Sequence, residues 1–413
     1  MKFRAYLIYF ILILTGNILP QNSNNSIPSL DSALVTYYSN DLPKAYDMLG
    51  AVIKSDSNNV DAVNYYSETC RRLGYFDESF LNANKALKIS GCSSFALSIL
   101  GDLYSPQYSS WEKTDYDSAW AYQLKAVECN KDEAQAYLSI WTLALQRGNQ
   151  EMENKALENL YRLKFFTGAV LSFNRWMLKA MPVNSILITN GDMDNYPALA
   201  LQLAENLRED VVIVNCSLLE KYSYADLMSK RYNIPLPYTS EEAKKIKPYY
   251  SDDSTTVRYL AYDIIEYWKQ LQRENELGRP LSFAITVNKK IMPDQKELKM
   301  LGPAFLFGSF SPGNKCDEET YDAAMTYLSG KDFNGDVVSD MDRSPVRHAA
   351  YKEFIKMNII QSYLYYAVNL NRLGQKDKAI NVFNWISQFE KDSESGKSIR
   401  DRIRKTRQLI NPN

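Results

Sequence analysis

Histidine is the scarcest chemically versatile residue here, since the 413-residue chain contains only His348. A zinc cage made of histidines, a metalloprotease helix and most Ser-His-Asp triads need more imidazoles, or need this particular one. His348 follows Pro345 in a segment that reads as the start of a helix, where a polar position is the simplest interpretation. Most histidine-dependent catalysis is therefore excluded, and we assign no catalytic residue.

Closely spaced cysteine pairs are absent as well. No two cysteines have the C-x-x-C spacing of a zinc ribbon or a dithiol redox motif. An odd and scattered set predicts buried free thiols. We expect Cys216 to be a small buried thiol rather than a nucleophile, because no histidine lies near it in sequence. The five cysteines are Cys70, Cys92, Cys129, Cys216 and Cys316.

The sequence also lacks an excess of positive charge. Lys plus Arg is 48 and Asp plus Glu is 49, which gives a formal net charge of -1. We therefore expect no nucleic-acid partner. With 45% hydrophobic and 23% charged residues, the composition is typical of a soluble globular protein of two or three domains.

The N-terminus has the layout of a secretory signal. Lys2 and Arg4 precede an apolar run from Tyr6 to Leu14, which is too short to span the roughly 30 Å of a bilayer core as a helix. We predict a signal peptide over residues 1–21, no stable membrane span after its removal, and a periplasmic or secreted mature protein.

A repeat of 34 residues organises residues 22–180. Ala45 and Ser79 are separated by this interval, and so are Ser67 and Gly101. A third unit carries about six extra residues within 105–113, and a degenerate fourth unit runs from Ala134 through Gly148 to Phe166. The units resemble tetratricopeptide repeats (TPRs), in which glycine opens the turn between antiparallel helices and small residues let the helices approach closely. An irregular helical bundle with coincidental spacing is the alternative.

Residues 181–315 change character. Short apolar, β-branched runs alternate with amphipathic helical segments, which favours a small α/β domain with a largely parallel, Rossmann-like sheet and right-handed crossovers. The four predicted strands are 185–189, 211–214, 281–287 and 304–307, and the helices include 198–207 and 255–276.

Residues 316–413 are predicted to be helical again, apart from a loop at 330–344. A further TPR-like unit spans Tyr363 to Gln388. The basic tail from Lys397 to Arg407 is interpreted as a solvated helix end, because cations are favoured near a helix C-terminus. A patch for an anionic partner is the alternative.

The strongest candidate site follows the first predicted strand. In an open α/β sheet, ligands bind beyond the carboxyl ends of strands, and Asp192 and Asp194 could there chelate Mg²⁺ or Ca²⁺. Asn215, after the second strand, could hydrogen-bond the 190–194 loop. Equally, Asp and Asn are common turn formers and helix N-caps. The candidate ligand-binding residues are Asn190, Gly191, Asp192, Asp194, Tyr196 and Asn215.

Another loop looks similar to a phosphate-binding motif but lacks its chemistry. Residues 308–315 follow a strand and are rich in glycine, yet the Gly-Lys-Ser/Thr ending is missing and Pro312 removes an amide donor.

Residues 185–219, with Gly374 to Ile380, carry a more specific resemblance. They are similar to the soluble C-terminal region of Bacteroidota multi-spanning membrane proteins related to protein O-mannosyltransferases, and the likeness covers roughly residues 181–390. The family's N-G-D-x-D-x-Y/F-P turn corresponds to Asn190 to Pro197 in this chain. The transferase chemistry is expected from the membrane-embedded part of that family, so the resemblance does not imply this activity here.

These observations predict an exported, non-enzymatic TPR scaffold that mediates protein–protein interaction in the cell envelope. Its repeats would present a concave surface to a protein or peptide partner. The alternative function is a glycan- or anion-binding accessory, or an enzyme, that uses a divalent cation at the Asp192/Asp194 turn.

Overall fold

The computed structural model describes residues 28–246, 249–250, 257–258, 260–310, 316–327, 345–387 and 396–410. The predicted signal peptide, the whole of the 330–344 loop, and residues 311–315 of the glycine-rich loop lie outside these ranges. His348 falls within helix α16, but its side chain is outside the described part.

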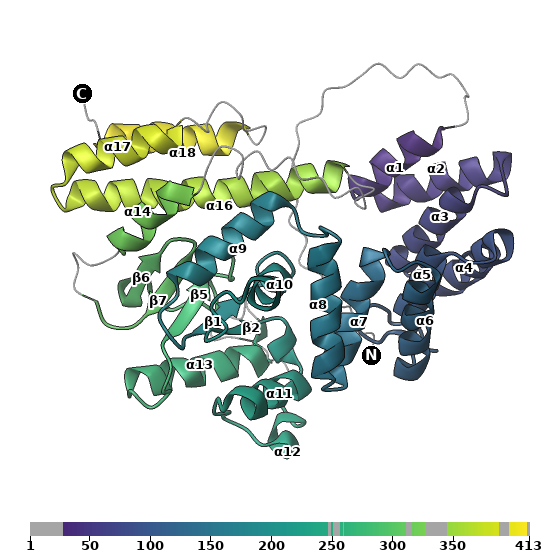
Figure 1. Ribbon diagram of the computed structural model, residues 1–413, viewed down its shortest axis with the longest axis horizontal. Helices are drawn as coiled ribbons and strands as arrows, with labels where there is room; N and C mark the ends of the chain where they lie inside the picture. Colours follow the sequence, from purple (N-terminus) through teal and green to yellow (C-terminus); the bar gives the residue numbers. More distant parts are fainter. Residues whose placement is uncertain are drawn as a thin grey trace.

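Eight helices at the N-terminal side form the predicted pairs (Figure 1). The first residues of α2 and α4, Leu42 and Phe76, are 34 residues apart, and so are those of α3 and α5. Between α4 and α6 the interval widens by six residues, in the loop that follows Tyr104. The helices are α1 (Leu30–Tyr38), α2 (Leu42–Ser55), α3 (Val60–Leu73), α4 (Phe76–Ser90), α5 (Ser94–Tyr104), α6 (Tyr116–Cys129), α7 (Ala134–Gln146) and α8 (Gln150–Arg162).

The turns after α1, α3, α7 and α16 (Pro345–Arg372) share one backbone conformation, whereas α5 and α6 are joined by the longer loop 105–115. Asn40, Gly74, Gly148 and Gly374 all have positive φ angles, of 63°, 85°, 63° and 80°. Gly adopts this left-handed conformation without steric cost, and Asn tolerates it better than most residues. The predicted role of glycine is therefore confirmed at Gly74, Gly148 and Gly374, whereas Asn40 takes this role in the first turn.

Close approach of the helices explains the small residues of the repeat. Ala45, Ser79 and Ala119 occupy equivalent positions and have no exposed surface. A Cβ atom on Gly101 would lie 2.6 Å from Nε2 of Gln123 on the neighbouring helix, so this position admits only glycine without a shift.

The sheet has five strands in the order β2-β1-β5-β7-β6. The pairs β2–β1 and β1–β5 are parallel, as predicted, but β7 is antiparallel to both β5 and β6. The expected largely parallel sheet is therefore mixed. The strands are β1 (Ile186–Thr189), β2 (Val212–Asn215), β5 (Leu281–Ala284), β6 (Leu298–Leu301) and β7 (Ala304–Phe307), and β3 (Tyr249–Tyr250) pairs separately with β4 (Val257–Arg258).

The mixed topology has a local cause. Leu301 and Ala304 are joined by Gly302 and Pro303 alone, and a two-residue connection can join only antiparallel neighbours. Gly302 takes φ 62° in this turn. The strand β6 was not predicted from the sequence.

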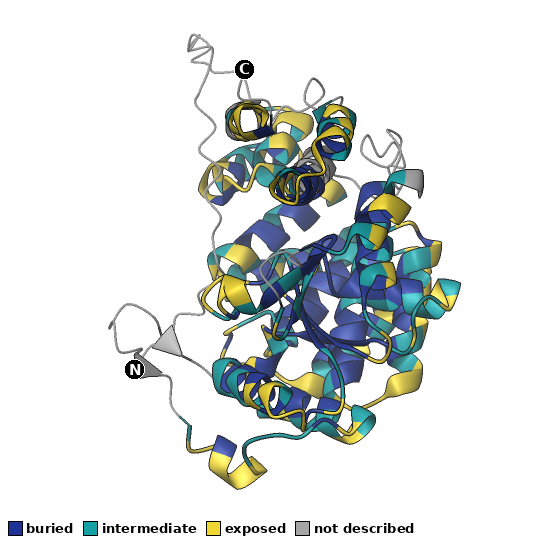
Figure 2. Ribbon diagram, turned by 90° about the vertical axis from the view of Figure 1, so that its left-hand side faces the viewer, coloured by how far each residue is buried: buried dark blue, intermediate teal, exposed yellow. Residues whose placement is uncertain are grey.

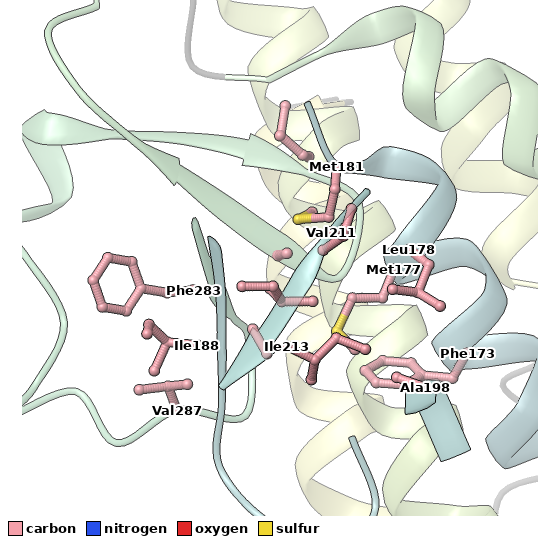
Figure 3. Close-up of a cluster of buried hydrophobic side chains, with 14 of the residues drawn as sticks. Phe173, Met177, Leu178, Met181, Ile188, Ala198, Val211, Ile213, Phe283 and Val287 are labelled. Atoms are coloured by element: carbon pink, nitrogen blue, oxygen red, sulfur yellow. The ribbon is translucent and has the colours of Figure 1, made fainter. Parts of the chain in front are cut away.

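Helices cover both faces of the sheet (Figure 1). Figure 3 shows Phe173 and Met177 of α9 (Gly168–Ala180) beside Ile213, whereas Ile188 and Phe283 lie on the other side of the strands. The second face is covered by α13 (Leu260–Arg273). The remaining elements of this region are α10 (Tyr196–Glu205), η1 (Leu218–Glu220), α11 (Tyr222–Tyr232), α12 (Ser240–Ala243) and η2 (Gln295–Glu297).

The C-terminal helices lie over α9. Tyr363 of α16 stacks on Trp176 of α9 with ring centroids 5.2 Å apart, and the far end of α16 contacts α1. These helices are α14 (Glu318–Tyr327), α16 (Pro345–Arg372), α17 (Lys376–Ser387) and α18 (Gly396–Ile410).

One hydrophobic core extends from Ala134 to Ile410 and therefore includes α7 to α9, the sheet and the C-terminal helices. Three smaller clusters stabilise the earlier repeats. Figure 2 shows the buried sheet and its flanking helices, with exposed residues on the outer helix faces. Packing is thus continuous across residue 181, where the sequence changes character.

Two cysteines correct the sequence prediction. Cys92 and Cys129 form a disulfide with a Cα–Cα distance of 6.1 Å, whereas all five cysteines were expected to be free. They pair because the repeat brings the ends of α4 and α6 together. Cys70, Cys216 and Cys316 are buried thiols, as expected, and burial raises the pKa of each to about 12.

Within the described ranges, no helix combines the length and apolar character that a membrane crossing requires.

Candidate ligand site at the carboxyl edge of the sheet

The acidic turn lies between β1 and α10, at the carboxyl edge of the parallel strands. Pro197 stands in the first turn of α10, where proline needs no hydrogen-bond partner for its nitrogen. The ends of β1, β2 and β5 meet at this edge, which is where open α/β sheets bind ligands.

Asp194 points into the protein and is 2% exposed. Its carboxylate accepts hydrogen bonds from the backbone N–H groups of Asn190 at 2.8 Å and Gly191 at 2.9 Å, and from the hydroxyl of Thr286. Burial raises the pKa of Asp194, although these three donors favour the charged form. The side chain therefore closes the turn and connects the ends of β1 and β5.

Two buried amides hold the rest of the turn. Asn195 donates from Nδ2 to Oγ1 of Thr189 at 3.2 Å, and Asn174 of α9 donates from Nδ2 to the carbonyl of Met193 at 2.8 Å. The turn is thus fixed from both the strand and the helix above it.

Asp192 has the opposite placement, because its side chain is exposed. Its negative charge adds to the effect of burial in raising the pKa values of Tyr108 and Tyr196. Tyr196 is itself buried, with its ring edge-on to Trp141 at 4.7 Å between centroids. Tyr196 is therefore a packing residue, and Asn190 and Asp192 are the exposed members of the turn.

The predicted hydrogen bond from Asn215 to the acidic turn is not formed. Oδ1 of Asn215 accepts from the N–H groups of Ser217 at 2.9 Å and Leu218 at 3.3 Å, because the chain turns back immediately after β2. Ser217 makes the link instead, donating from Oγ to the carbonyl of Asn190 at 3.0 Å.

The extended loop of the third repeat reaches this edge of the sheet, which the sequence did not predict. Gln107 accepts a hydrogen bond from Nζ of Lys221, just after η1. The hydroxyl of Tyr108 lies 2.7 Å from Oγ1 of Thr142, and Arg71 donates to the Tyr108 carbonyl at 2.9 Å. We call the resulting surface the junction surface, defined by Gln107, Asn190, Asp192, Ser217 and Lys221.

Ion pairs link neighbouring helices where the repeats meet the α/β region. Arg231 of α11 donates to both oxygens of buried Glu153 at 2.8 and 2.9 Å. Glu153 replaces the small residue found at this position of the earlier repeats. Arg175 pairs with Glu205 at 2.5 Å. The Glu205 carboxylate also accepts a hydrogen bond from the hydroxyl of Tyr161 at 2.8 Å.

The junction surface offers amide, carboxylate, hydroxyl and ammonium groups, which suit hydrogen bonding to a polar ligand. Among the described residues, no group of three or more His, Cys, Asp or Glu is arranged to hold a metal ion. Asp194 is 2% exposed, so chelation by Asp192 and Asp194 together would require the turn to open.

Comparison with known proteins identifies one family in this region. The family described as TMEM260-associated domain 2 matches residues 170–300, which include the acidic turn and most of the sheet. No curated protein matches the chain significantly.

Two crystal structures of MamA are similar in part. One has 15% sequence identity and a TM-score of 0.27, covering 50% of this chain and 97% of that chain. The other has 16% identity and a TM-score of 0.27, covering 54% and 96%. The assignment of helical repeats therefore rests on the helix spacing described above.

Proposed function

We propose that this protein is an exported, non-enzymatic scaffold of the bacterial cell envelope, and that the junction surface binds a segment of a protein partner. The observation that carries the proposal is the placement of the third repeat's loop. Its extra residues bring Gln107 to Lys221, and Ser217, four residues before Lys221, donates to the carbonyl of exposed Asn190. Polar groups of the repeats and of the α/β region thus meet at the junction surface.

The inner face of the repeats is a poorer docking surface than the sequence indicated. On α3, residues 62–65 and 67–70 are buried, and on α5 so are residues 96–103. Side chains that are already covered offer little area to a peptide. We therefore locate partner binding at the junction surface rather than on the concave face.

Export is supported by the Cys92–Cys129 disulfide, because such bonds persist in the periplasm and outside the cell but rarely in the cytosol. The match of residues 170–300 to a TMEM260-associated domain agrees with the resemblance to O-mannosyltransferase-related membrane proteins. A partner in the same envelope is consistent with both observations.

A paired substitution tests the proposal. Asp192→Ala with Lys221→Ala removes two exposed charges of opposite sign from the junction surface, and Asp77→Ala with Lys88→Ala does the same on α4. Affinity capture from envelope extract should lose the specific partner at least about tenfold with the first pair and retain it with the second. Equal recovery with both pairs would refute the proposal.

The alternative function is a glycan- or anion-binding accessory, or an enzyme, that uses a divalent cation at this turn. This alternative is favoured by the oxygen atoms of Asn190, Asp192 and Ser217, which are exposed and are of the kind that Ca²⁺ and Mg²⁺ take as ligands. Calorimetric titration with Ca²⁺ and Mg²⁺ distinguishes the two functions. Binding that is abolished by Asp192→Asn would support the cation site.

A further inference from the structure

Helix α18 carries a strong excess of positive charge on its exposed surface. Asp401 is the one acidic residue in the segment 400–410. The helix lies on the outer side of the C-terminal region, beside α16 and α17 (Figure 1). Five exposed cations project from it, namely Arg400, Arg402, Arg404, Lys405 and Arg407.

The helix macrodipole does not explain this charge. Favourable interaction of cations with the dipole is limited to the last turn, which contains only Arg407. Asp401 pairs with Arg404 at 3.1 Å, so one carboxylate compensates one of the five cations in this helix. The interpretation as a solvated helix end therefore accounts for a minor part of the patch.

Packing fixes the direction in which the cations project. Ile403, Thr406 and Ile410 are buried, so this side of α18 faces the rest of the protein. Arg402 donates to Gln361 on α16, and the guanidinium of Arg407 lies 5.6 Å from the ring centroid of Phe383 on α17. The cations therefore lie on both flanks of the buried side, with Arg400, Arg404 and Arg407 along one flank and Arg402 and Lys405 along the other.

Two exposed leucines lie at the same end of the protein. Leu409 is 61% exposed and Leu373 is 41% exposed. Asn371 donates from Nδ2 to the carbonyl of Leu409 at 3.0 Å, which brings the end of α16 beside the end of α18. Exposed Arg372 flanks these leucines. Cations surrounding apolar side chains are typical of helices that lie in a membrane interface.

We propose that the exposed surface of α18, with its five cations and Leu409, binds together with the neighbouring Leu373 to the surface of an anionic phospholipid bilayer. Its positive charge complements lipid phosphates, and the leucines would enter the boundary of the acyl region. Exposed leucines favour a bilayer over nucleic acid, whose phosphate backbone offers them no apolar contact. The inference is independent of the partner proposed for the junction surface.

Vesicle sedimentation tests the proposal with the chain from residue 22 onward, which keeps every described residue and removes the apolar N-terminal run. Binding should be strong with phosphatidylcholine vesicles that contain about 30% phosphatidylglycerol, weak with pure phosphatidylcholine, and reduced at about 0.5 M salt. Equal binding to both vesicle types would overturn the electrostatic mechanism.

A matched pair of triple variants locates the binding face. Neutralising Arg400, Arg404 and Arg407 to Gln should lower binding to the anionic vesicles at least about tenfold. Neutralising Lys88, Lys125 and Lys155, which are exposed on α4, α6 and α8, changes net charge equally and should alter binding less than about twofold. Similar losses in both variants would contradict the assignment.

A second readout separates the bilayer from other anionic partners. Leu409→Ser should weaken binding to the vesicles several-fold without changing its dependence on salt. A duplex DNA fragment is the competing probe. If the protein binds the duplex DNA and does not bind the anionic vesicles, the proposal is wrong and the α18 surface is a nucleic-acid site.

Discussion

The first three repeats and the rest of the protein are stabilised in different ways. Between Leu30 and Cys129, small clusters join each helix mainly to its neighbours, and a disulfide spans two repeats. From Ala134 onward, one core joins the last repeat, the sheet and the C-terminal helices. The first region therefore behaves as a linear array, whereas the second is expected to unfold as a unit.

The junction surface lies at the boundary between these two differently stabilised regions. It lies where the array ends, between the loop carrying Gln107 and the rigid turn that Asp194 closes. A partner that binds there contacts both regions, so relative motion between them would weaken its binding.

Two buried tryptophans give the largest expected effect. Trp176 is packed between Gly302 and Tyr363 in the large core, whereas Trp111 lies in a cluster of the repeats. Trp176→Ala should cost about 3–5 kcal/mol and lower hydrogen-exchange protection throughout the sheet and α16. Trp111→Ala should lower protection in α4 to α6 alone. Equal loss of sheet protection in both variants would show that the two regions are not distinct.

Reduction of the Cys92–Cys129 disulfide should have the next largest effect. The bond joins residues that are 37 apart in sequence. A cross-link over this interval lowers the chain entropy of the unfolded state, which stabilises the fold by about 3–4 kcal/mol. The loss of exchange protection should be confined to the repeats. A Cys92→Ser, Cys129→Ser variant is the control, and it should show no response to reductant; a response there would assign the effect to another part of the chain.

The two aspartates of the acidic turn should differ by about 2 kcal/mol. Asp194→Ala leaves two backbone N–H groups and Thr286 without their acceptor, which costs about 2–3 kcal/mol. Asp192→Ala removes an exposed carboxylate and should change the free energy of unfolding by less than about 0.5 kcal/mol. Urea unfolding without added metal measures both. Equal destabilisation would contradict the structural role given to Asp194.

A smaller effect is expected from the pH dependence of the repeats. Burial raises the pKa of Asp102 from 3.8 to about 6, with Arg71 opposing the shift. Between about pH 4 and 6 the folded state therefore keeps a proton that the unfolded chain releases. The free energy of unfolding falls as the pH rises through this range and stays constant above about pH 6. Asp102→Asn should remove this slope and stabilise the repeats at pH 7. An unchanged slope would show that Asp102 is ionised in the fold.

Much of the architecture could be predicted because it depends on local spacing. The intervals from Ala45 to Ser79 and from Ser67 to Gly101 identify the helix pairs, and β-branched runs identify β1 and β2. The antiparallel β6 could have been found from its two-residue connection, Gly302-Pro303, which is a turn signal between two apolar runs.

The site was harder to predict, since side-chain direction and tertiary contact decide it. Asp192 and Asp194 are equivalent in a sequence pattern, yet one is exposed and the other is buried against Thr286, almost a hundred residues away in the chain. The pairing of Cys92 with Cys129 and the contact of Gln107 with Lys221 likewise arise only when the repeats stack.

Site-specific photocrosslinking in intact cells tests the central claim most directly. A photoreactive residue at position 192 would lie on the junction surface, and one at position 88 would lie on the exposed side of α4. The account predicts one discrete crosslinked protein from position 192 and none from position 88. No crosslink from position 192, or the same product from both positions, would contradict it.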